Sequence, residues 1–212
     1  MSIEVLLSGF EPFDGAATNP SWEAVHRAAE LLRAEGITAQ PLLLPVEFTV
    51  AAERLIAAAR ELRPDLVIAV GLAAGRTAIT PERVAVNIQD ARIPDNAGAA
   101  PVDVPCVSDG PVGYFSTLPI KAMTAAMSAI EGVTATVSQT AGTYVCNDVF
   151  YQLQHALDVD VVLHDADIRG GFVHIPEAEV IGVDAVARAL VAGVHAARTH
   201  RADRAISGGT EH

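Results

Sequence analysis

Short runs of hydrophobic residues alternate along the chain with longer segments in which hydrophobic residues recur every three or four positions. The short runs and the alternating segments predict β-strands, because strands of a buried sheet are brief and apolar. These strands are expected at residues 5–9, 42–44, 66–70, 84–88, 134–137 and 170–175. The longer segments have the spacing of one helical face. They predict helices at residues 20–35, 51–62, 121–130, 146–157 and 184–198.

Residues with known preferences mark the ends of several of these helices. Asn19 is a good N-cap, Pro20 fits the first helical turn, and Gly36 is typical of a helix end. Strands that alternate with helices indicate an α/β fold with three layers, α/β/α, around a mostly parallel, twisted central sheet.

The length of 212 residues suits one domain, which we expect to span residues 1–198. Residues 199–212 are polar and are expected to form a frayed tail. The Pro-, Gly- and Asp-rich stretch 90–113 predicts a long functional or mobile loop and is a candidate for subunit contact. The oligomeric state stays open, with a homodimer or homotetramer among the alternatives.

Composition narrows the partners and the compartment. A net charge of −12 without a basic cluster argues against nucleic acid as a partner. Two cysteines without a disulfide framework favour a reducing compartment. The N-terminus lacks the features of a signal peptide, and no run is long enough to span a membrane. We therefore expect a cytoplasmic protein without membrane partners.

Cys146 lies where a predicted strand gives way to a predicted helix. The positive end of a helix dipole favours the thiolate, which is the nucleophilic form of cysteine. Position alone leaves the alternative that Cys146 is a buried and inert thiol, which is the commoner role of free cysteines.

A cysteine nucleophile needs a base, and the base needs a group that orients it. His174 follows the last predicted strand, so it could reach the same edge of the sheet as Cys146. Glu82 could orient an imidazole. The structural alternatives are a hydrogen-bonded core histidine for His174 and an ordinary ion pair for Glu82.

Other chemical motifs are weaker. His164 lies near Asp165 and Asp167, but the spacing matches no metal motif. The segment Gly71 to Arg76 follows a strand and lacks the spacing of a phosphate-binding loop. Phe10 and Phe13 are equally consistent with residues that anchor a loop to the core.

Four segments together resemble the pyrrolidone carboxyl peptidase (pyroglutamyl peptidase I) family of cysteine peptidases. They appear in the family's order and place the resemblance over about residues 3–191. The segments are SGFEPF (8–13) with NPSWE (19–23), ITPERVAVN (79–87) continuing to DARIPDN (90–96), TAGTYVCN (140–147), and GFVHIP (171–176). The departures are Asp14 where glycine is usual, Asp148 where the residue is often bulkier, and the poorly matched stretch 158–169.

The resemblance implies a phosphorylase/hydrolase-like α/β/α fold and removal of an N-terminal pyroglutamyl residue from peptides through a thioester. It implies a catalytic triad of Glu82, Cys146 and His174. The backbone N–H of Cys146 and the side chain of Arg92 are the expected oxyanion donors. The expected substrate-binding residues form a pocket for a neutral lactam. They are Phe10, Phe13, Asn19, Ile93, Tyr144 and Val145.

The resemblance also implies that neither a metal nor an organic cofactor takes part. Two other functions remain as alternatives. One is a catalytically silent α/β module that binds a small ligand, and the other is an enzyme that resembles nucleoside phosphorylases.

Overall fold

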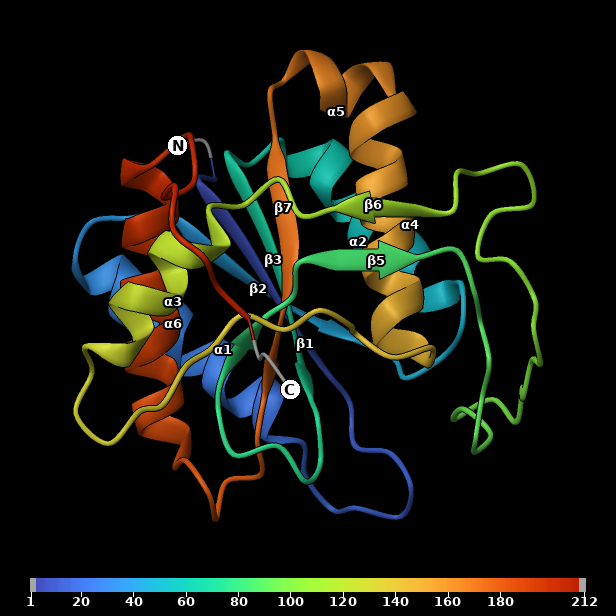
Figure 1. The fold of residues 1–212 in the computed structure, drawn as a ribbon, viewed down its shortest axis with the longest axis horizontal. Helices are drawn as coiled ribbons and strands as arrows, with labels where there is room; N and C mark the ends of the chain where they lie inside the picture. Colours follow the sequence, from blue (N-terminus) through green and yellow to red (C-terminus); the bar gives the residue numbers. More distant parts are fainter. Residues whose placement is uncertain (1–2, 210–212) are drawn as a thin grey trace.

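The computed structural model describes residues 3–209 and shows three layers, with helices on both faces of a central sheet (Figure 1). The sheet has five strands in the order β2-β1-β3-β7-β4. The first four strands are parallel, and β4 pairs antiparallel with β7. The predicted three-layer α/β fold is therefore confirmed.

Strands and helices alternate from β1 to β3, after which three short strands and then three helices precede β7. The elements are β1 (Val5–Phe10), α1 (Pro20–Ala34), β2 (Ala39–Leu44), α2 (Val50–Leu62), β3 (Leu66–Leu72), β4 (Thr80–Pro81), β5 (Val84–Val86), β6 (Gly113–Phe115), α3 (Ile120–Ser128), α4 (Val145–Val159), α5 (Val161–Asp165), β7 (Arg169–Ile175) and α6 (Val183–Thr199). Helices α1, α3 and α6 lie on the left of the sheet in Figure 1, and α2 and α4 lie on the right.

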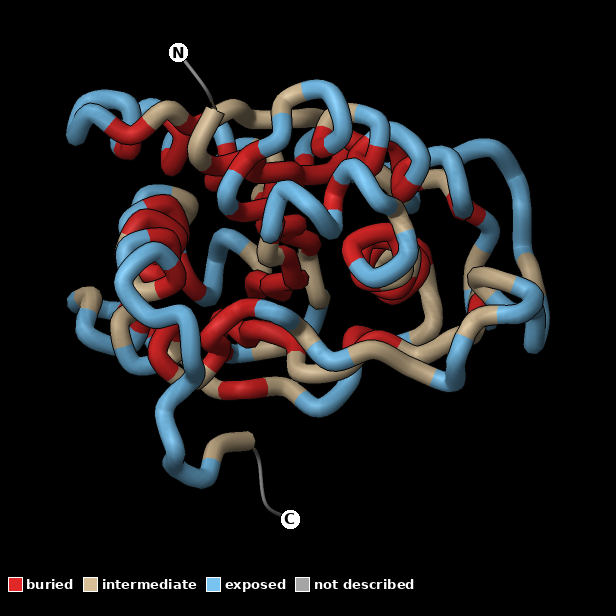
Figure 2. Tube along the Cα trace, turned by 90° about the horizontal axis from the view of Figure 1, so that it is seen from above, coloured by how far each residue is buried: buried red, intermediate tan, exposed pale blue. Residues whose placement is uncertain are grey.

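Two hydrophobic clusters fill the space between the sheet and the helices on its two faces. One joins the sheet to α1, α3 and α6, and the other joins it to α2 and α4. Buried positions gather in the interior of the molecule, while the outer faces of the helices are exposed (Figure 2). The helical spacing in the sequence thus corresponds to one buried face on each helix.

Local signals placed the start of α1 correctly. The Asn19 side chain accepts a hydrogen bond from the Ser21 N–H, and Pro20 is the first helical residue. Gly36 follows the helix with φ of 86°, a conformation that favours glycine.

The expected strand at 134–137 is wrong as a strand. Residues Ala135 and Ser138 form only isolated parallel bridges, to Ile79 and Glu82. Four backbone hydrogen bonds join residues 134–138 to residues 79–83, but Pro81 in that facing segment has no N–H to donate, so the ladder is interrupted there. The sequence pattern also missed α5, a single short turn capped by Asp160.

The expected strand at 84–88 is shorter and belongs to a separate sheet. β5 pairs antiparallel with β6, and the connection between them protrudes from the body of the molecule in Figure 1. This connection corresponds to the long loop expected from the sequence.

The polar tail is hydrogen-bonded to the domain within the described residues 200–209, and residues 210–212 of the expected frayed tail lie outside them. The Asp203 carboxylate accepts hydrogen bonds from the backbone N–H groups of Lys121 and Ala122 at the start of α3. The Gly208 carbonyl accepts one from Arg83 at 2.7 Å. Between residues 3 and 209, no helix is long and apolar enough to cross a membrane.

Candidate active site

Cys146 lies in the first turn of α4, beside the carboxyl end of β3. A Cβ atom built on Gly71 would be 2.8 Å from the Cys146 Sγ, so the thiol rests directly on the backbone of β3. Only a residue without a side chain leaves this space free. Cys146 itself is half-buried.

His174 is the residue of β7 that pairs with Gly71. Paired residues on neighbouring parallel strands point to the same face of a sheet and lie about 4.8 Å apart across it. The imidazole therefore emerges on the face where the thiol rests. The sheet register brings together two residues that are 28 positions apart in the sequence.

Glu82 follows β4, and its backbone N–H donates to the Phe172 carbonyl at 2.9 Å. Its side chain is completely buried, with Oε1 2.8 Å from Nδ1 of His174. With Nδ1 directed at the carboxylate, Nε2 is the imidazole nitrogen that is left for proton exchange. The geometry is that of a base oriented by a carboxylate.

The electrostatics of the site favour a neutral thiol and a neutral imidazole at rest. Burial, assisted by the negative charge of Glu82, raises the pKa of Cys146 to about 12. Burial also lowers the pKa of His174, against the opposing effect of Glu82. The helix dipole favours the thiolate, as expected from the sequence, whereas desolvation and Glu82 act against it.

A mostly apolar pocket opens next to the thiol. Its lining residues come from the carboxyl ends of β1 and β3, the chain after β2 and the start of α4. They are Phe10, Phe13, Asn19, Val46, Leu72, Tyr144, Val145 and Cys146. Five of the six substrate-binding residues expected from the sequence are in this set.

Asn19 has two tasks in this pocket. Its Oδ1 accepts from the Ser21 N–H and hydroxyl, and its Nδ2 donates to the Glu11 carbonyl at 2.9 Å. These bonds confirm the N-cap role and hold the amide still at the pocket wall.

Arg92 and Ile93 line a second cavity that adjoins the first. The two cavities share Phe13, Leu72 and Tyr144. The exposed Arg92 side chain and the half-buried Ile93 thus lie beside the pocket that contains Cys146, and they are not among its lining residues.

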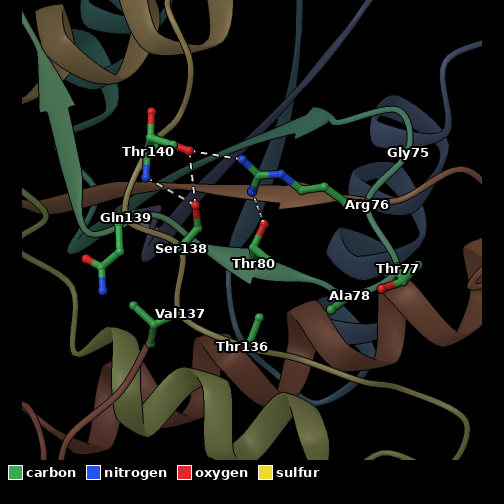
Figure 3. Close-up of a pocket in the computed structure, with 10 residues that line it drawn as sticks. All are labelled: Gly75, Arg76, Thr77, Ala78, Thr80, Thr136, Val137, Ser138, Gln139 and Thr140. Carbon is green, nitrogen blue, oxygen red and sulfur yellow. Dashed lines mark hydrogen bonds between the residues drawn. The ribbon is translucent and has the colours of Figure 1, made fainter. Parts of the chain in front are cut away.

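Arg76 contacts the buried carboxylate, which the sequence pattern did not predict. Its guanidinium donates to Oε1 of Glu82 at 2.7 Å and to the Thr140 carbonyl at 2.9 Å. Figure 3 shows the side chain extending between Thr80 and Thr140 along a cavity of about 420 Å³. The available signal in the sequence is the position of Arg76, an arginine soon after the carboxyl end of β3, where site residues gather in α/β folds.

Gly71, Val46 and Leu72 were also missed as site residues. All three lie at or just after the carboxyl ends of β2 or β3, where ligands bind in open α/β sheets. The same position at the carboxyl ends of strands is therefore the signal that could have identified them in the sequence.

The remaining chemical candidates do not form sites. His164 and Asp165 are exposed, and no group of three His, Cys, Asp or Glu residues within 3–209 is placed to hold a metal. Cys106 lies away from any histidine contact, and burial raises its pKa to about 12.

A thiol, an imidazole and a carboxylate in this order beside an apolar pocket can form and hydrolyse an acyl-enzyme. The family model described as pyroglutamyl peptidase matches residues 3–197. A pyrrolidone-carboxylate peptidase of Pseudomonas fluorescens is 50% identical over 198 residues, covering 91% of this chain and 90% of the relative. One from Clavibacter michiganensis is 47% identical over 215 residues, covering 97% and 98%.

Solved structures show the same likeness. The pyroglutamyl peptidase I of Bacillus amyloliquefaciens is 40% identical with a TM-score of 0.87, covering 98% of this chain and 100% of that one. The pyrrolidone carboxyl peptidase of Thermococcus litoralis is 32% identical with a TM-score of 0.83, covering 97% and 99%. The chain belongs to the pyroglutamyl peptidase family.

Proposed function

We propose that this protein is a cysteine peptidase that removes pyroglutamate from the N-terminus of peptides, with Cys146 as its nucleophile. One observation carries the assignment of residues. The Cys146 thiol rests on Gly71, the strand partner of His174, and His174 is in turn bonded to the buried Glu82. The family membership supports the reaction, and this geometry supports the roles.

In the first step the sulfur of Cys146 attacks the pyroglutamyl carbonyl carbon while Nε2 of His174 takes the thiol proton. Glu82 stabilises the imidazolium that forms. Collapse of the tetrahedral intermediate breaks the C–N bond, and His174 delivers the proton to the leaving amine. The product that stays on the enzyme is a thioester.

In the second step His174 takes a proton from water, and the resulting hydroxide attacks the thioester. The C–S bond breaks, the thiol regains its proton, and pyroglutamate leaves as a carboxylic acid. The negative oxygen of each intermediate needs donors. The N–H of Cys146, in a helical turn whose amides lack partners within the helix, is the first, and Arg92 from the adjoining cavity is the second.

Pocket chemistry explains the choice of substrate. Phe10 and Phe13 provide apolar walls for the flat ring, Asn19 bonds the lactam, and Tyr144, Val145 and Ile93 complete the enclosure. A peptide with a free α-ammonium would bury a charge without an anionic partner in the lining of the pocket, which is costly. Ordinary N-termini are thereby rejected.

The assignment is tested by release of a chromophore from a pyroglutamyl amide. Cys146→Ser and His174→Ala are expected to lower kcat by about 1,000-fold or more, because each removes a group that takes part in bond making. Cys106→Ser is the matched control and should keep wild-type activity. Undiminished activity of the Cys146 or His174 variant would refute the role given to that residue.

Two properties of the protein in the cell complete the proposal. We place it in the cytoplasm, as two free cysteines suit a reducing compartment. We also propose a homodimer or homotetramer that uses the 90–113 loop region, where Val112 and the following Phe115 are exposed. Neither a silent binding module nor a phosphorylase is favoured, and phosphate-independent release of free pyroglutamate would distinguish the peptidase from a phosphorylase.

A further inference from the structure

Arg76 is the cation next to the buried carboxylate of the proposed triad. Glu82 has 0% exposure, whereas the Arg76 side chain keeps 27% of its surface in contact with solvent. The two are 2.7 Å apart, and Oε2 of Glu82 has no hydrogen-bond partner among residues 3–209. Arg76 and His174 therefore meet at the same oxygen, Oε1.

A fully buried carboxylate needs such a neighbour. Removal from water disfavours a charged group unless a group of opposite charge lies close to it. The Arg76 guanidinium provides that opposite charge next to Glu82.

The other bonds of Arg76 reach β4 and the loop that precedes the nucleophile. Besides Glu82, one amino group donates to the Thr80 hydroxyl, and the second donates to the Thr140 carbonyl. Thr80 belongs to β4, which pairs with His174, and Thr140 lies in the loop that leads into α4 and Cys146. A planar fork with several donors can satisfy these acceptors together, and an ammonium group cannot.

We propose that Arg76 is a positioning residue of the reaction, which holds Glu82 directed at His174 and ties that pair to the loop before Cys146. This inference rests on the proposed function, because it assigns Arg76 a role through the triad. Arg76 is absent from the lining of the pocket that contains Cys146, so its effect falls on the chemical step.

The pH dependence of the reaction reports this role. The titrating and charged groups of the cluster are Glu82, His174, Cys146, Tyr144 and Arg76 itself. The positive charge of Arg76 lowers the pKa of both Cys146 and His174. Removing a cation from such a cluster makes every group in it bind its proton more tightly, so the activity profile moves to higher pH.

The experiment compares Arg76→Met, Arg76→Lys and the wild type over a range of pH. Arg76→Met should lower kcat about tenfold or more, leave KM within about twofold, and move the acid limb of the profile up by about half a pH unit or more. Arg76→Lys keeps the charge without the fork, so its acid limb should stay near that of the wild type while kcat falls.

Arg83→Met is the matched control. Arg83 adjoins Glu82 in the sequence but bonds Gln139 and Gly208, so its removal takes away one positive charge without a contact to the triad. Its kcat and acid limb should equal those of the wild type.

Chemical rescue provides a test that does not depend on the stability of the methionine variant. Arg76→Ala opens space at the 420 Å³ cavity, and added guanidinium, far below denaturing concentrations, should restore kcat and the acid limb. An equal concentration of methylammonium should restore less.

The outcomes separate two failures. Wild-type activity that depends on Cys146, together with an unchanged kcat and acid limb in Arg76→Met, would overturn the role of Arg76 alone. Full activity of Cys146→Ser would overturn the proposed function itself. Equal losses in Arg76→Met and Arg83→Met, without rescue by guanidinium, would also refute the positioning role.

Discussion

At the scale of single residues, the resting state of Cys146 is set by a balance of charges. Burial and Glu82 favour the thiol, and Arg76 opposes them. His174 is likewise kept neutral by burial, because its pKa is lowered. We therefore expect the thiolate to form during attack, by transfer of its proton to His174, rather than in the free enzyme.

This balance predicts the rate at which iodoacetamide alkylates Cys146. Since the pKa of the thiol is raised to about 12, the thiolate fraction below that value grows with pH. Alkylation in a Cys106→Ala background should therefore accelerate about tenfold per pH unit between about pH 6 and pH 9. Intact-protein mass spectrometry measures the rate, and a pH-independent plateau in this range would indicate a preformed thiolate–imidazolium pair instead.

At the scale of elements, the site depends on how closely α4 approaches the sheet. β3 and β7 are parallel neighbours, and their carboxyl ends carry Gly71 and His174. The first turn of α4 is fixed further by Asp148, whose buried carboxylate accepts from the Thr49 N–H and from Gln89. The helix start, the chain before α2 and the loop after β5 are thus joined next to the nucleophile.

Gly71→Ala tests this close approach. The new methyl group would lie 2.8 Å from Sγ of Cys146 and 2.8 Å from the ring of Phe172, so the thiol has to move. We expect kcat/KM to fall about tenfold or more and the free energy of unfolding to fall by about 1–3 kcal/mol. Kinetics on a pyroglutamyl amide and urea unfolding measure the two effects.

Gly182→Ala is the control for the glycine substitution. Position 182 has open space around its Cβ and an ordinary φ of −57°. The Gly182→Ala variant should therefore keep the kcat/KM and the free energy of unfolding of the wild type. Wild-type kinetics in Gly71→Ala would show that the thiol does not need the space at β3.

At the scale of the whole molecule, the tail at residues 200–209 contacts α3, which lies on the other face of the sheet from α4. Pro119 at the start of α3 provides no side-chain cap, and Asp203 from the tail takes that place. Arg83, next to Glu82, bonds the tail at Gly208. The tail therefore connects α3 with the edge of the sheet.

Removal of residues 200–212 should lower the free energy of unfolding by about 1–2 kcal/mol, because it takes away the cap of α3. Activity should persist, since the described part of the tail, residues 200–209, contributes no residue to the pocket that contains Cys146. Chemical denaturation measures the stability, and Asp203→Ala should reproduce most of the loss. Equal stability of the truncated and full chains would contradict the capping role.

Local patterns predicted much of this fold. The 3.6-residue period locates the buried faces of helices, and Asn19 with Pro20 marks a helix start, because both effects act over a few neighbouring residues. The segment at 134–138 shows the limit of such patterns. Its alternation predicts extended chain, and the segment does pair with residues 79–83. Pro81 in that partner has no N–H to donate, however, so two isolated bridges form in place of a continuous strand.

The sequence by itself determined the alternation of strands and helices, the family, and the residue types that could form a triad. Only the tertiary structure decided that Gly71 leaves room for the thiol, that Arg76 shares an oxygen of Glu82 with His174, and that desolvation raises the pKa of the thiol. The physical reason is range. Propensity and capping are local, whereas register, burial and electrostatics join residues that are distant in the chain and exist only once the sheet and α4 have come together.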